Sequence, residues 1–169
     1  MAYLVLISFI LLFAYLGVTF VKYGIPNYIS DGFYVNKCKW AFSVTMVLVS
    51  GLLLPAMLDI GNEDFGFLAF ISVVCIFILA AEPHFKSSWE GKIHNTAAII
   101  AGVCSQLWCF LHCWQSSLIV WLFLALVFAF GYKYVKQKEK PLKTLKMGYW
   151  TEVTAFANVY LTLLIIKFV

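Results

Sequence analysis

Residues 2–21 read AYLVLISFILLFAYLGVTFV, a run without a charged side chain, and Lys22 follows directly. A helix rises about 1.5 Å per residue and satisfies its own backbone hydrogen bonds, so a run of this length can cross a hydrocarbon core of about 30 Å. Similar uncharged runs recur along the chain. Together they predict six transmembrane helices, at about residues 2–21, 40–58, 65–81, 96–114, 117–132 and 149–166.

The composition agrees with a membrane protein. Of the 169 residues, 63% are hydrophobic and 12% are charged, which leaves too little polar surface for a soluble globule. No segment reads as a separate soluble domain, so we expect an all-α polytopic membrane helix bundle, with residues 1–169 as a single transmembrane domain. The third and sixth runs are the weakest, because Gly66 lies at the start of one and Glu152 lies inside the other. Five spans are therefore the alternative.

The lysines are distributed unevenly among the gaps between these runs. The first, third and fifth gaps contain them, whereas the charged residues of the second gap are all acidic and the fourth gap has no charge. By the positive-inside rule, the lysine-containing gaps are cytoplasmic and both termini are non-cytoplasmic. This predicts a multi-pass protein of a plasma or inner membrane. The lysines in question are Lys22, Lys37, Lys39, Lys86, Lys92, Lys133, Lys136, Lys138, Lys140, Lys143 and Lys146.

The basic charge does not indicate a nucleic-acid partner. The net charge of +4 arises from lysine alone, because the chain has no arginine. Without arginine forks or a glycine-rich phosphate loop, the lysine-rich segment 133–146 is typical of a topology signal at anionic headgroups. The expected partners are the lipid bilayer and further copies of the same chain.

Polar residues gather at the face predicted to be cytoplasmic. Carboxylates and imidazoles at one membrane depth can bind a cation, relay protons or act as acid and base. The alternative is a structural role, in which these side chains cap helices or pair with lysines, and Asn95 caps the fourth span. Asn158 belongs instead to a polar stripe on the sixth span, which either lines a hydrated pathway or bonds to other helices. The transport or ligand-binding candidates are Asp31, Glu82, His84, His94, Asn95, Glu152 and Asn158.

The fourth span carries a face of small residues, Ala98, Gly102, Ser105, Cys109 and Cys113. Small residues at this spacing predict close approach of a neighbouring helix. The nearby Cys-Phe-Leu-His-Cys sequence has too few partners for a zinc site, so we interpret its cysteines as buried apolar residues. The sequence indicates no metal and names no cofactor.

These features favour a channel or transporter subunit that moves an ion or small solute past the cytoplasmic polar cluster. A conducting path forms more easily between copies, so a homo-oligomer is expected. Motifs of soluble enzymes are absent, which argues against an enzyme. One alternative is an intramembrane hydrolase acting on lipid, and another is a non-catalytic partner or sensor subunit.

The hydrolase alternative depends on Ser43, Ser50, Asp59 and His112. This set resembles the scattered Ser, Asp and His residues of the ceramidase and progestin-receptor-like membrane hydrolases. However, the chain lacks the late His-x-x-x-His pair of that group and has one span fewer. No residue is therefore assigned a role from the resemblance.

Overall fold

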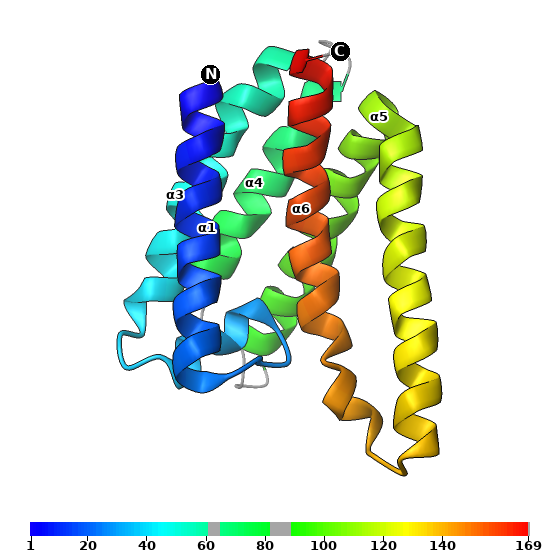
Figure 1. Cartoon of the computed structure of the whole chain (residues 1–169). Coiled ribbons are helices and arrows are strands. Elements are labelled where there is room, and N and C mark those ends of the chain that lie inside the picture. Colours follow the sequence, from blue (N-terminus) through cyan, green and yellow to red (C-terminus); the bar gives the residue numbers. More distant parts are fainter. Residues whose placement is uncertain (61–64, 82–88, 169) are drawn as a thin grey trace.

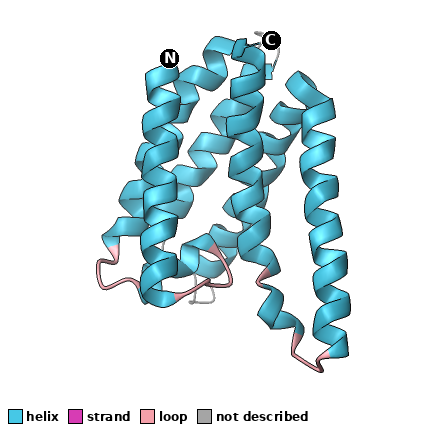
Figure 2. Cartoon of the chain, viewed as in Figure 1, coloured by secondary structure: helices cyan, strands magenta, loops and turns pink. Residues whose placement is uncertain are grey.

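The computed structural model describes residues 1–60, 65–81 and 89–168, and this part of the chain is helical without a strand (Figure 2). The all-α prediction is therefore confirmed. The elements are α1 (Ala2–Tyr23), η1 (Ile29–Asp31), α2 (Gly32–Val35), α3 (Trp40–Ile60), α4 (Gly66–Ala81), α5 (Glu90–Gln137), η3 (Leu142–Leu145) and α6 (Met147–Phe168).

Helix α5 consists of two arms joined by a sharp bend. Cys113 lies outside the helical region, with φ −150° and ψ 69°. The Trp121 Nε1–H group donates to Gln106 Oε1 over 3.1 Å, although a straight helix would separate these residues by roughly 22 Å. The chain therefore reverses at Cys113, and the two arms run side by side (Figure 1). The predicted break between residues 114 and 117 lies close to this bend.

Four of the described helices are long and apolar enough to cross a membrane, and they comprise Ala2–Tyr23, Trp40–Ile60, Glu90–Gln137 and Leu142–Lys167. Helix α4 is apolar but shorter. The outer surface agrees with a lipid environment, because large apolar side chains such as Ile119, Phe123 and Phe130 are exposed. The helices are thus compatible with a membrane protein. Both termini lie at the same end of the bundle (Figure 1).

The core lies where α1, α3, α4, α6 and the first arm of α5 meet. Leu12 on α1, Val49 on α3, Trp108 on α5 and Leu163 on α6 are almost completely buried in one apolar cluster. Helix α1 packs on α3, while α4 packs between α3 and α5. Helix α6 completes the bundle by packing on α5.

Residues 24–39, here called the capping segment, connect α1 to α3 across the end of the bundle opposite the termini (Figure 1). Asp31 stabilises its turn, because Oδ2 accepts the backbone N–H groups of Asn27 and Tyr28 over 3.1 and 3.2 Å. Ile29 and Phe33 bury their side chains in the core. The segment therefore closes this end of the bundle.

Gly148, in the first turn of α6, is required by the contact between α6 and the capping segment. A Cβ atom there would clash with the Tyr28 ring and lie 2.9 Å from the Asn27 carbonyl oxygen. We expect Gly148→Ala to lower the free energy of unfolding by about 1–3 kcal/mol, the usual cost of overpacking. Equilibrium unfolding in detergent measures this loss.

Gly17→Ala on α1 is the matched control, because no described atom beyond the adjacent backbone of α1 lies within 4 Å of the added carbon. It should stabilise the protein by about 0.5–1 kcal/mol, since alanine has the higher helix propensity. Equal stability of the two variants would contradict the proposed clash.

Candidate functional site

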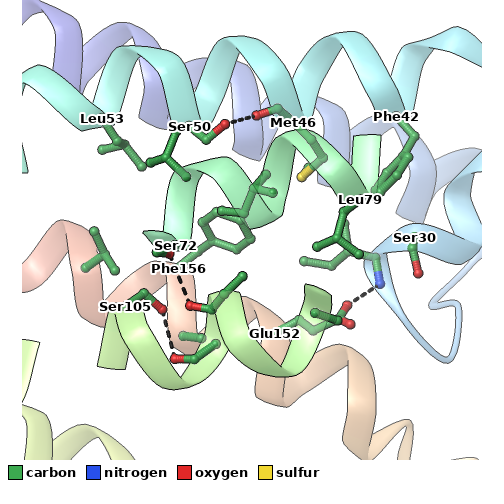
Figure 3. A pocket seen from close by; sticks show the side chains of 18 of the residues that line it. Ser30, Phe42, Met46, Ser50, Leu53, Ser72, Leu79, Ser105, Glu152 and Phe156 are labelled. Atoms are coloured by element: carbon green, nitrogen blue, oxygen red, sulfur yellow. Dashed lines mark hydrogen bonds between the residues drawn. The ribbon is translucent and has the colours of Figure 1, made fainter. Parts of the chain in front are cut away.

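A partly open cavity of about 130 Å³ lies between α3, α4, the first arm of α5 and α6 (Figure 3). The capping segment contributes Ile29 and Ser30 to its wall. A cavity of roughly this size inside a protein can hold a benzene-sized molecule. Most of the wall is apolar, and the larger of these side chains are Phe42, Met46, Leu53, Met57, Val73, Ile76, Leu79, Phe156 and Val159.

The cavity exists because the first arm of α5 presents small residues to it. Ala98, Gly102 and Ser105 all border the open space, and among the described residues no atom beyond the adjacent backbone of α5 lies within 4 Å of a Cβ at Gly102. The prediction of close helix approach is therefore wrong at Gly102, since the side chains of α3 and α6 do not fill the space opposite. Farther along this face, Cys109 is buried in the core, as expected.

One end of the cavity is polar. Glu152, from the second turn of α6, and Ser30, from the capping segment, lie together there (Figure 3). His94 also lines the cavity, from the second turn of α5, and is 4% exposed. Both helices begin at the end of the bundle opposite the termini, so the fold brings these groups to one depth.

The Glu152 carboxylate connects the cavity to the capping segment. Its Oε2 accepts the backbone N–H of Ile29 over 2.6 Å. In the described part of the chain, no donor bonds to Oε1, and Glu152 remains partly accessible where it lines the cavity. One oxygen of the carboxylate therefore has a structural role, and the other can accept from a bound molecule.

Three serines in the rest of the wall can act as hydrogen-bond acceptors. Ser50 donates its proton to the Met46 carbonyl over 2.6 Å. Ser72 and Ser105 donate to the carbonyls of Ala101 and Gly102, over 3.1 and 3.0 Å. Because each hydroxyl proton is already used, each oxygen can only accept further hydrogen bonds, and Ser105 Oγ already accepts one from Gln106 Nε2 over 3.3 Å. Together with Glu152, these groups suit a bound molecule that donates hydrogen bonds.

Asn158 lies outside the cavity, in a buried polar network that joins α6 to both arms of α5. Its Nδ2 group donates to Gln106 Oε1 over 2.9 Å and to Ser117 Oγ over 3.2 Å. Gln106 also accepts from Trp121 and donates to the Ala155 carbonyl over 3.1 Å. These contacts agree with the interhelical interpretation of the α6 stripe.

Several of the predicted site residues lie elsewhere. Within the described residues, the Asp31 carboxylate accepts hydrogen bonds from the turn of the capping segment described above, and it interacts with Glu152 through its charge without lining the cavity. Asn95 is exposed on α5, and it does not cap the helix, because α5 begins at Glu90. Glu82 and His84 lie outside the described residues. Of the predicted set, the fold therefore brings His94 and Glu152 to the cavity.

Sequence reasoning missed Gln106 and Ser72, and it named Ser50 and Ser105 only in other roles. Gln106 was detectable as an amide inside an apolar run, but its pairing with Asn158 requires the bend at Cys113. The three serines alternate with apolar residues on different helices, so no single run shows that they border one space.

The groups of the hydrolase alternative are dispersed. Ser43 and Asp59 are near opposite ends of α3, separated by roughly 24 Å of helix. His112 donates from Nδ1 to the Trp108 carbonyl over 2.8 Å and stacks on the Trp108 ring. Within the described ranges, no three His, Cys, Asp or Glu residues are grouped as metal ligands.

Comparison of the chain with protein-family models, curated proteins and solved structures finds no match.

Proposed function

We propose that this protein is a membrane carrier for a compact amphipathic solute with a cationic, hydrogen-bond-donating end. The observation that carries the proposal is a carboxylate at the polar end of an otherwise apolar cavity inside the bundle. An amine of the solute would face Glu152 Oε1, and its hydrocarbon part would fill the space beside Gly102. The serine hydroxyls already donate their protons to backbone carbonyls, so they have no proton left to donate to an anionic solute.

A carrier fits the cavity better than an open channel does. At one end, the capping segment covers it with Ile29, which is 4% exposed. Toward the other end, the almost completely buried Trp108 and Leu163 follow the last lining residues of α5 and α6. A channel needs a continuous path, whereas a carrier needs an enclosed site that opens to either side. Assembly into a homo-oligomer stays a prediction, since a cavity within one copy does not require a second.

We infer six membrane crossings with both termini on the non-cytoplasmic side. The bend at Cys113 supports this topology, because it divides α5 into arms of roughly 34 and 36 Å, each long enough for one crossing. The common end of the two termini supports an even number of crossings. With the lysine distribution, this arrangement would put Glu152 and the capping segment on the cytoplasmic side.

The test is binding of benzylamine, a compact aromatic amine, to the purified protein in detergent, followed by uptake into proteoliposomes. Gly102→Leu should weaken binding by about tenfold or more, because the added side chain occupies a cavity of this size. Gly17→Leu, on the exposed face of α1, should bind as the wild type does.

The outcomes separate the parts of the proposal. Failure of the wild type to bind benzylamine or longer alkylamines would overturn it, as would equal binding by the Gly102→Leu and Gly17→Leu variants. Binding without uptake would assign the cavity to a receptor or sensor subunit and would contradict the carrier.

A further inference from the structure

A second hollow lies on the lipid-facing side of the bundle, between α1, α3 and α6, at the end where the termini lie. Its volume is about 490 Å³, within the range of roughly 300–1,000 Å³ that is usual for small-molecule sites. We propose that this groove binds one phosphatidylethanolamine molecule, with an acyl chain in the groove, the phosphate at Lys167 and the ammonium group at Asp59. The proposal is independent of the interior cavity.

The floor of the groove is Tyr160, where α1 and α6 come together. Its hydroxyl is hydrogen-bonded to Ser8 over 2.7 Å, and Ser8 donates to the Val49 carbonyl over 3.1 Å. The Phe9 ring packs edge-on to Tyr160, with centroids 5.3 Å apart. The polar atoms of the floor are therefore satisfied by protein, and what remains for a ligand is apolar surface.

The walls have the length and character that an acyl chain requires. From Phe9 to Ala2 on α1, and from Tyr160 to Lys167 on α6, the groove extends roughly 10 Å along each helix. This is a large part of the ~15 Å depth of hydrocarbon in one leaflet. Ala2 and Ala56 leave the width open, because neither has a side chain that reaches across.

The charges at the mouth select the headgroup. Asp59 and Lys167 both line the groove and are exposed, and neither forms an ion pair within the part of the chain that the structure describes. Lysine is a good donor to phosphate, and a carboxylate accepts from a primary ammonium. A choline headgroup has no N–H to donate, and a glycerol headgroup brings no cation to Asp59. The pair of opposite charges therefore matches ethanolamine.

Native mass spectrometry of the full chain in a nonionic detergent tests the site. The added lipids are palmitoyl-oleoyl phosphatidylethanolamine, phosphatidylcholine and phosphatidylglycerol in equal amounts. We expect a one-to-one adduct that favours phosphatidylethanolamine. Lys167→Gln should lower the affinity for all three lipids by about tenfold. Asp59→Asn should lower the affinity for phosphatidylethanolamine by about tenfold and so remove the preference for it. Lys22→Gln, at the opposite end of α1, is the matched control and should change neither.

A steric variant tests the acyl-chain part of the proposal separately. Ala2→Trp, at an exposed position in the first turn of α1, should close the groove and abolish the adduct. Its free energy of unfolding in detergent should stay close to that of the wild type, which shows that the bundle is intact without relying on amine binding and keeps the two proposals distinguishable. The proposal is overturned if the adduct survives Ala2→Trp, or if phosphatidylglycerol binds the wild type as well as phosphatidylethanolamine does.

Discussion

Replacement of Asn158 by leucine should lower the free energy of unfolding by about 2–4 kcal/mol. We expect no larger loss from any other single substitution that keeps the side-chain volume nearly constant. Asn158 is completely buried. Its loss leaves Ser117 without a partner amide and removes one of the donors to Gln106 Oε1. Hydrogen bonds between membrane helices average only about 0.6 kcal/mol, so most of the cost comes from the buried groups left unpaired.

Unfolding of the purified protein in mixed micelles measures this loss. Thr151→Val is the matched control on the same helix, because Thr151 is exposed and its hydroxyl bonds only to the Met147 carbonyl, over 2.9 Å. The double variant Asn158→Leu with Gln106→Leu should lose less than the sum of the single changes, since both remove one interaction. An Asn158→Leu variant as stable as Thr151→Val would mean that water satisfies this network, which would favour the hydrated pathway instead.

The helices could be predicted from the sequence because the length and composition of an uncharged run are enough to identify an apolar helix. The predicted ends were less accurate where a helix extends past its apolar run. The second arm of α5 continues from the predicted residue 132 to Gln137, since the backbone of Lys133 and Lys136 stays helical while the ammonium groups can reach polar surroundings. The change of direction near residue 114 was predictable, but its location at Cys113 was not, because no proline or glycine marks it.

The candidate site was predictable in part. Glu152 and His94 were identified by their depth near helix ends, and helix direction alone brings them to one end of the bundle. The cavity itself could not be predicted, because it results from a mismatch of volume between Gly102 and the side chains of other helices. The role of Glu152 in holding the capping segment was also hidden, since its partner is the backbone of Ile29.

Glu152→Gln should weaken benzylamine binding by about 30-fold or more, because removing one charge of a desolvated pair costs about 2–5 kcal/mol. Glutamine keeps the size of the side chain and an oxygen that can accept from Ile29 N–H, so the fold should survive. Binding of toluene, which has no amine, should change by less than about twofold, since only apolar contacts hold it. Isothermal titration of both molecules against both proteins gives the comparison.

The Asp31→Asn variant distinguishes the effect of the Glu152 charge on binding from the effect of the capping segment's stability. Asp31 holds the turn of the capping segment and acts on Glu152 only through its charge, without lining the cavity, so its amide variant should lose much less benzylamine affinity than Glu152→Gln does. If both variants lose binding equally, the capping segment and not the Glu152 charge controls affinity. A bound amine should leave the hydrogen bond between Ile29 N–H and Glu152 in place, because the amine donates to Oε1 and the amide donates to Oε2. Hydrogen exchange at the Ile29 amide should therefore stay as slow or become slower when benzylamine binds to the wild type, and faster exchange there would show that the amine draws Glu152 away from the capping segment.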